Sequence, residues 1–211
     1  MKPLVALFAF SFNLMGPAGK VVNFDSDQIG QAPPGWTVAK TAKGAASNWQ
    51  VRRDQTAPTQ PYVLAGLSAD PTETHSPLAI LNDPMTRDAD VSVRIKPVSG
   101  REGLAGGVVW RYKDENNYYV ARANAGENTV SLFKVENGKK IPIMAGVKHA
   151  IPANEWSILK VQVRGNRFQV FVDHRRVLDG QDKTFSAPGR VGLWTLAGSV
   201  IYFDDFRVYP K

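Results

Sequence analysis

Side chains that could bind a ligand are concentrated between Gly106 and Ala125, where the sequence reads GGVVWRYKDENNYYVARANA. Twenty positions hold one Trp, three Tyr, two Arg, one Asp and three Asn. Arg carries a rigid fork of donors that suits paired oxygens, and an aromatic face suits the apolar side of a pyranose ring. This composition is typical either of a surface that binds a ligand or of a β-hairpin whose residues only stabilise the sheet.

The alternation within this stretch predicts a hairpin whose connection runs from Asp114 to Asn117, residue types that accept the backbone angles of tight loops. The first face of this hairpin, predicted to be core or an aromatic surface, carries Val108, Trp110, Tyr112, Tyr119, Ala121 and Ala123. The second face carries Val109, Arg111, Tyr118, Val120, Arg122 and Asn124. Two Arg on one half-buried face repel each other unless an anion or a polar ligand lies between them.

We therefore predict that a carbohydrate or acidic glycan binds over this second face. Arg111 and Arg122 would donate hydrogen bonds to its hydroxyls or carboxylates, and Tyr118 or Trp194 would stack on a ring. Trp194 comes from a later alternating strand. The competing interpretation is structural, because cross-strand pairs stabilise sheets without any ligand and a Trp is commonly buried.

The residues needed for a nucleophilic or zinc-dependent centre are not arranged for it. His75, His149 and His174 fall in predicted loops or turns, and none stands beside a Gly-x-Ser-x-Gly elbow. No His-x-His or His-Glu-x-x-His spacing is present to hold zinc. The chain has no cysteine, which excludes disulfides, thiolate metal sites and a cysteine nucleophile.

Strands of period two are predicted to position these side chains. From Asp88 onward, alternation predicts strands at 89–96, 105–112, 118–124, 129–136, 139–144, 156–164, 168–172, 190–195 and 200–208. The N-terminal half offers shorter candidates at 21–24, 49–53, 62–65 and 78–81. No helical period of useful length occurs. Roughly a dozen short strands with tight turns predict an all-β, two-sheet antiparallel sandwich.

Length and charge bound the remaining possibilities. The chain of 211 residues is 43% hydrophobic and has no internal repeat, so residues 19–211 are predicted to form a single domain.

The net charge of +7 is spread through strands and turns, with no run longer than a pair such as Arg52-Arg53. Attraction to acidic glycans or a bacterial surface fits this distribution better than nucleic acid, which we do not predict as a partner. A scattered charge that only keeps the protein in solution is the alternative.

Several motifs, taken together, resemble the concanavalin A-like lectin and glucanase superfamily. They are Gly107-Val108-Val109-Trp110-Arg111, Asp114, Asn117-Tyr118-Tyr119, Leu132-Phe133-Lys134, Trp156, Phe168 to Asp173, Gly189 to Trp194 and Phe203-Asp204-Asp205-Phe206. Within the superfamily, the chain is most similar to exported bacterial laminin G-like domains and to 3-keto-disaccharide hydrolases, formerly a domain of unknown function. The motifs are specific for a fold and weak for an activity.

The resemblance implies a jelly-roll sandwich with a concave sheet on which sugars commonly bind. It also implies, as one candidate cofactor, a structural calcium ion that joins the first strand to the last. Asp25 and Asp27 near the start, with Asp204 or Asp205 near the end, could supply its carboxylate ligands. The alternative is that Asp25 and Asp27 cap a turn while Asp204 and Asp205 mark a bulge.

The acidic motifs of the superfamily's enzymes are missing. Retaining glucanases carry Glu-x-Asp-x-x-Glu, which places a nucleophile and an acid on one face, and this sequence has no such triplet. Where the 3-keto-disaccharide hydrolases are expected to show Asn-Ser-Gly, the chain reads Leu104-Ala105-Gly106-Gly107-Val108. We predict an exported carbohydrate-binding or interaction domain without catalysis. The alternative is a 3-keto-disaccharide hydrolase-like glycoside hydrolase that uses carboxylates such as Asp90.

The first eighteen residues are predicted to be a signal peptide. Lys2 precedes an apolar run from Leu4 to Met15 that is too short to cross a bilayer comfortably, and Gly16-Pro17-Ala18 offers small residues for cleavage. The mature protein is then secreted or periplasmic, and no later segment is apolar enough to hold it in a membrane.

Cleavage is expected after Ala18 or close to it, because the positive, apolar and small-residue segments follow in the order that signal peptidase requires. Mass spectrometry of protein purified from the periplasm or the medium measures the mature N-terminus. A mature product that still carries Met1 would contradict the prediction.

Overall fold

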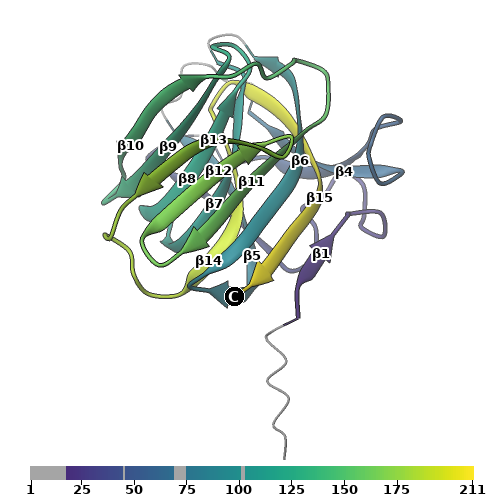
Figure 1. Cartoon of the computed structure of the whole chain (residues 1–211). Coiled ribbons are helices and arrows are strands. Elements are labelled where there is room, and N and C mark those ends of the chain that lie inside the picture. The colour runs from purple at the N-terminus through teal and green to yellow at the C-terminus, as the bar shows by residue number, and fades with distance from the viewer. Residues whose placement is uncertain (1–17, 45, 69–74, 101–102) are drawn as a thin grey trace, which may run out of the picture.

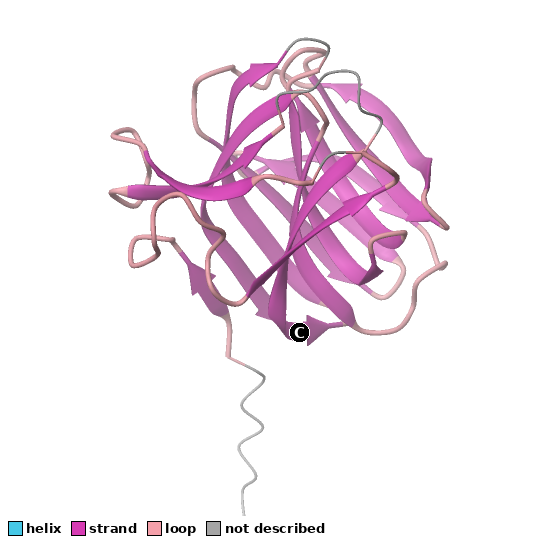
Figure 2. Cartoon of the chain, turned by 180° about the vertical axis from the view of Figure 1, so that it is seen from behind, coloured by secondary structure: helices cyan, strands magenta, loops and turns pink. Residues whose placement is uncertain are grey.

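The computed structural model describes residues 18–44, 46–68, 75–100 and 103–211. These residues form strands, turns and loops, and Figure 2 shows no helix among them. Accordingly, none of them belongs to a helix long and apolar enough to cross a bilayer. The predicted signal peptide, apart from Ala18, lies outside the described residues.

The strands form two antiparallel sheets that pack face to face (Figure 1). The eight-stranded sheet runs in the order β13 (Arg175–Gln181), β12 (Arg167–Val172), β11 (Ser157–Arg164), β6 (Ala89–Gly100), β15 (Ser199–Pro210), β4 (Tyr62–Leu67) and β3 (Trp49–Arg53), with β1 (Lys20–Val22) also paired to β15. The seven-stranded sheet runs in the order β10 (Lys139–Lys148), β9 (Thr129–Glu136), β8 (Asn117–Asn124), β7 (Ala105–Asp114), β14 (Gly189–Thr195), β5 (Ser76–Thr86) and β2 (Trp36–Thr41). The predicted all-β, two-sheet antiparallel sandwich is confirmed.

Apolar side chains fill the space between the sheets because each strand buries alternate residues. At one centre of this core, Trp110 of β7 stacks on Tyr119 of β8 with ring centroids 5.5 Å apart. Phe168 of β12 meets Trp110 edge-on at 5.2 Å and so joins the opposite sheet to this pair. Gly106 is needed nearby, because a Cβ there would lie 2.7 Å from the Ile95 side chain.

A second apolar cluster lies on the outer face of the seven-stranded sheet. Its buried members are Leu78, Ile80, Ala105, Val109, Tyr112, Tyr118, Val120, Val135 and Trp194. Along β7 and β8 these residues alternate with those of the inner core, so the cluster belongs to the opposite side of the same strands. This sheet is therefore apolar on both faces over part of its surface.

A bulge in the β7–β8 hairpin changes the predicted faces. Trp110 pairs with Tyr119 and Asp114 with Asn117, whereas the register between Trp110 and Asp114 is broken. Arg111 occupies this break with a left-handed φ of 48°. The predicted faces are therefore wrong at two positions: Tyr112 lies with the outer cluster, and Arg111 turns toward the ring of Phe168 in the inner core. Between Val109 and Tyr112, β7 has one residue more than its other neighbour, β14, and an extra residue in one strand reverses the alternation beyond it.

Trp110→Ala is expected to lower the free energy of unfolding by about 3 to 5 kcal/mol, because it removes a fully buried ring between two aromatic partners. Urea titration followed by circular dichroism measures the change. Val21→Ala, at a valine of β1 that is 52% exposed, is the control and should change stability by less than about 1 kcal/mol. Equal effects of the two substitutions would contradict this account of the core.

Candidate ligand-binding groove

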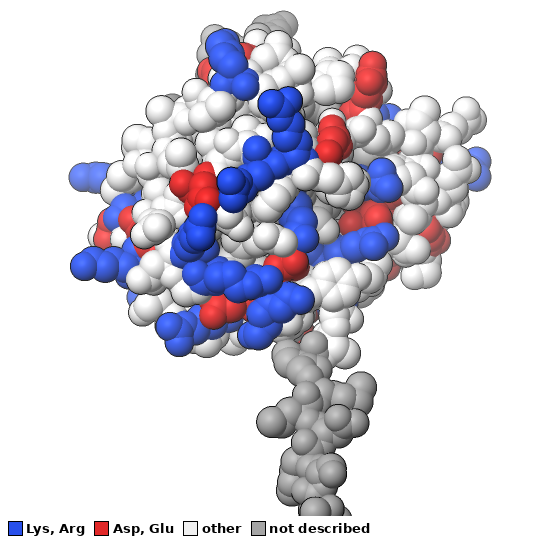
Figure 3. Space-filling model, in the orientation of Figure 1, with Lys and Arg blue, Asp and Glu red and all other residues white. Residues whose placement is uncertain are grey.

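A groove of about 460 Å³ crosses the outer face of the eight-stranded sheet over β6, β11, β12 and β15. Its lining is Asp90, Ser92, Val93, Arg94, Ile158, Lys160, Phe171, His174, Asp205, Arg207 and Tyr209. The space-filling view in Figure 3 shows Lys and Arg side chains running across this side of the molecule with Asp and Glu between them. The groove thus combines charged hydrogen-bonding groups with aromatic and aliphatic walls.

Strand register brings the charged residues side by side. Along β6, alternation directs Asp90, Ser92 and Arg94 outward while Val91, Val93 and Ile95 enter the core. Ser92 pairs with Lys160 of β11 on one side and with Arg207 of β15 on the other. Side chains directly opposite each other on neighbouring strands lie about 5 Å apart at Cβ. Lys160, Ser92 and Arg207 therefore form one row across β11, β6 and β15.

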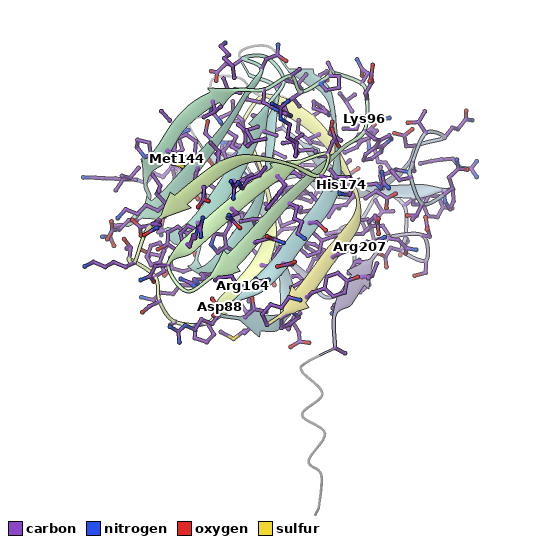
Figure 4. All side chains as sticks on the ribbon, viewed as in Figure 1. Asp88, Lys96, Met144, Arg164, His174 and Arg207 are labelled. Atoms are coloured by element: carbon purple, nitrogen blue, oxygen red, sulfur yellow. The ribbon has the colours of Figure 1, made fainter. Side chains whose placement is uncertain are left out.

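A bulge near the middle of β15 sets the position of Asp205. The register with β6 shifts between Asp204 and Arg207, and Asp205 has a left-handed φ of 51°. Its carboxylate accepts hydrogen bonds from Nε and Nη2 of Arg207, both at 2.8 Å. Nε of Arg94 lies 3.6 Å from the same carboxylate. Asp205 therefore holds Arg207 in place and draws Arg94 toward the groove (Figure 4 labels Arg207).

Asp90 is the second carboxylate of the groove. It accepts hydrogen bonds from Nη2 of Arg164 at 2.6 Å and from the Gln162 amide at 3.3 Å, and Nζ of Lys160 lies 3.0 Å away. Burial alone would raise the pKa of Asp90, but the hydrogen bonds from Arg164 and Lys160 outweigh it and lower that pKa. Asp90 is therefore ionised at neutral pH and serves as an acceptor, whereas a general acid needs a raised pKa.

Arg111 is placed in the interior and not on a binding face. Its side chain is 2% exposed and donates to the backbone carbonyls of Arg87, Phe185 and Gly165 and to the carboxylate of Asp88. Burial lowers its pKa, and the charge of Asp88 opposes that change. Contrary to the prediction, Arg111 does not face a ligand together with Arg122, because the bulge turns Arg111 between the sheets.

The other three predicted binding residues do share the outer face of the seven-stranded sheet. Tyr118 and Trp194 are buried there, and the Tyr118 hydroxyl lies 2.7 Å from Oγ1 of Thr41. Nη2 of Arg122 lies 3.2 Å from Glu127, and its guanidinium carbon stands 5.2 Å from the centroid of Phe133. Stacking on a sugar needs an exposed ring face, which neither Tyr118 nor Trp194 has in this structure. Their role in binding stays a prediction. The groove on the eight-stranded sheet, in contrast, has exposed polar and aromatic side chains.

The residues predicted to bind calcium do not form one cluster. The described residues contain no group of three or more His, Asp or Glu that could hold a metal ion. Asp205 is engaged by Arg207, both oxygens of Asp204 accept hydrogen bonds from Thr59, and Asp25 accepts one from the Tyr62 amide. The donor set therefore does not fit the six to eight oxygens of a calcium site.

Sequence comparison gives a partial match to a characterised enzyme. No family model matches the chain. Over 109 residues, 51% of the chain, it is 37% identical to a levanase of Bacillus subtilis (strain 168). The chain spans 15% of that protein's length, so the match concerns one segment of a much longer polypeptide.

Structural comparison decides the fold. A carbohydrate-binding module, CBM66, from Bacillus subtilis is 26% identical and superimposes with a TM-score of 0.65, over 83% of this chain and 96% of the module. The β-glucanase of Bacillus licheniformis matches with a TM-score of 0.61 at 13% identity, over 92% and 99% of the two chains. The chain has the concanavalin A-like lectin and glucanase fold. Domain 4 of the arabinanase AbnA from Geobacillus stearothermophilus, solved with arabinotriose, shares this concanavalin A-like fold at a TM-score of 0.58 and 14% identity, over 90% of each chain.

The groove residues were visible in the sequence as the polar positions of an alternating strand. Alternation predicted the strand at 89–96, whose polar positions include Asp90, Ser92 and Arg94, but no signal indicated which strands lie beside it. Lys160 and Arg207 are more than sixty residues away along the chain. Only the pairing of β6 with β11 and β15 brings the five together.

Arg111→Ala is expected to lower the free energy of unfolding by about 3 kcal/mol or more, because it removes a buried guanidinium that donates to three backbone carbonyls and to Asp88. Thermal and urea denaturation measure the effect. Arg164→Ala is the matched control: its side chain is 46% exposed, so its ion pair with Asp90 should contribute about 1 kcal/mol or less. A fully stable Arg111→Ala variant that has lost binding of a glycan would reverse our assignment.

Proposed function

We propose that the chain is a carbohydrate-binding domain without catalytic activity, and that a saccharide occupies the groove on the eight-stranded sheet. The likeness to the carbohydrate-binding module CBM66 carries this proposal, because it extends over 96% of that module at 26% identity. The 37% identity to a segment of a levanase supports the same class of ligand.

The chemistry of the groove supports a polyhydroxylated ligand. Arg94 and Lys160 are partly exposed and offer donors, and the carboxylates of Asp90 and Asp205 offer acceptors. A hydrogen bond that involves a charged group contributes about 1.5 to 3 kcal/mol. Tyr209, 39% exposed, supplies an aromatic surface for the apolar side of a sugar ring.

Hydrolysis is the second candidate function, and one observation favours it. Asp90 and Asp205 both line the groove, and glycoside hydrolysis uses two carboxyl groups. The charges around them favour binding instead: Arg207 and Arg94 flank Asp205, Lys160 and Arg164 flank Asp90, and the pKa of Asp90 is lowered. A proton donor for the leaving oxygen needs the opposite shift. Release of reducing sugar from the saccharide that binds would favour the enzyme.

The proposed location is outside the cytoplasm. Residues 1–18 have the order of segments of a signal peptide, and the absence of cysteine is compatible with an oxidising compartment. A binding domain that is exported in this way would meet polysaccharides at the cell surface or in the medium.

A glycan array followed by calorimetry tests the function. The mature chain is expected to bind at least one saccharide, and Tyr209→Ala and Lys160→Ala are each expected to weaken that binding about tenfold, the effect of losing one ring contact or one charged hydrogen bond. Lys139→Ala is the matched control, because Lys139 is an exposed cation on β10 of the other sheet.

Thermal melting of each variant separates loss of contact from loss of fold. Binding that survives in both groove variants but is lost in Arg122→Ala would move the site to the seven-stranded sheet. A chain that binds no saccharide on the array would refute the proposed function.

A further inference from the structure

The groove holds more positive than negative charge. Arg94, Lys160 and Arg207 line the groove with Asp90 and Asp205, and Arg164, outside the lining, is paired with Asp90. Three lining cations against two carboxylates leave an excess of one positive charge among the Lys, Arg and Asp side chains, and Arg164 raises it to two. Each carboxylate is already shared between two cations, so the excess is not removed by pairing within the groove.

Among the four cations at the groove, Arg94 has the most N–H donors without an acceptor. Among the acidic groups of the described chain, its guanidinium approaches only Asp205, and 3.6 Å is too long for a hydrogen bond. Its side chain is 38% exposed. Because a guanidinium carries five N–H donors, Arg94 can bind paired ligand oxygens without giving up an existing hydrogen bond.

Strand register places three cationic residues on the positions next to Ser92. Ser92 pairs with Lys160 on β11 and with Arg207 on β15, and Arg94 lies two positions further along β6 on the same face. Ser92 itself is only partly buried. Asp90 and Asp205 offset only part of the repulsion among these cations, and an anion held between them would offset the rest.

We propose that this part of the groove, formed by Ser92, Arg94, Lys160 and Arg207, binds the negatively charged substituent of an acidic saccharide. The inference rests on the proposed function and narrows it from carbohydrates in general to charged ones. The carboxylate of a uronic acid and a sulfate ester share the required chemistry, since both present paired oxygens to Arg and Lys. The rings of Tyr209 and Phe171 line the groove beside this cluster and offer apolar contact to the sugar that carries the charge.

The size of the excess argues for a saccharide over nucleic acid. Neutralisation of six to ten phosphates is typical of specific DNA binding, whereas the groove has an excess of two charges and two fixed carboxylates that would repel a phosphate backbone. An acidic sugar needs only one anion at the cluster, and its hydroxyls can donate to Asp90 and Asp205.

Calorimetry on the mature chain with matched saccharides tests the proposal. The probes are trigalacturonic acid, its methyl ester and a sulfated galactose trisaccharide. Each is measured at about 0.05 M and about 0.5 M salt, where the Debye length is about 14 Å and about 4 Å. At low salt at least one of the two acidic probes is expected to bind about tenfold or more tightly than the neutral ester. The stronger of the two identifies carboxylate or sulfate as the group recognised.

Variants show where the preference arises. Arg94→Ala is expected to weaken binding of the acidic probes more than binding of the neutral ester and so to remove most of the acidic preference, while the melting temperature stays close to that of the parent because Arg94 makes no hydrogen bond that the fold requires. Lys139→Ala removes one charge from the other sheet and should keep the preference. Arg94→Lys retains the charge and should restore part of it.

Each contrary outcome is distinct. Equal binding of acidic and neutral probes, with both lost in Tyr209→Ala, overturns the charge preference and leaves the proposed function standing. An acidic preference that falls equally in Lys139→Ala and Arg94→Ala reflects overall charge and also overturns it. Tighter binding of a DNA duplex than of any saccharide overturns it in favour of nucleic acid. Failure of every saccharide to bind refutes both proposals.

Discussion

The structure depends on the position of β6 between β11 and β15. Because β6 is paired on both edges, its alternation is fixed: Val91, Val93 and Ile95 must face the core, and Asp90 and Arg94 must face outward. A shift of one residue against either neighbour would bury two charges and expose three apolar side chains. The same constraint that encloses the core therefore assembles the groove.

Bulges place the residues that regular alternation would misplace. In β7 the break after Trp110 turns Arg111 inward, where it joins the backbone carbonyls at 87, 165 and 185 to its own strand. In β15 the break after Asp204 leaves that residue fully buried against Thr59, while Asp205 reaches the groove cations. Both breaks are marked by a non-glycine residue with a left-handed φ, a conformation that the surrounding hydrogen bonds must maintain.

Period-two alternation predicted most strands, and therefore the sandwich, because it follows directly from burial of one face. It missed β2, whose Trp36–Thr41 stretch follows a Pro- and Gly-rich turn, and β13, which begins with Arg175-Arg176 at an exposed edge. The hairpin faces were predicted correctly up to Trp110 and wrongly at Arg111 and Tyr112, because no residue type near Arg111 indicates a bulge in the strand. The groove could not be predicted, because its cations come from strands that are adjacent only after folding.

The pairing of β1 with β15 places the two ends of the described chain next to each other. Lys20 lies opposite Val208, and a Cβ added to Gly19 would meet the ring of Tyr209, a wall of the groove. Anything fused to either end, whether an affinity tag or a neighbouring domain, therefore emerges beside one mouth of the groove. Immobilisation through a terminus would crowd this entrance, whereas attachment through the exposed β9–β10 turn at Asn137 and Gly138, in the other sheet, would leave it open.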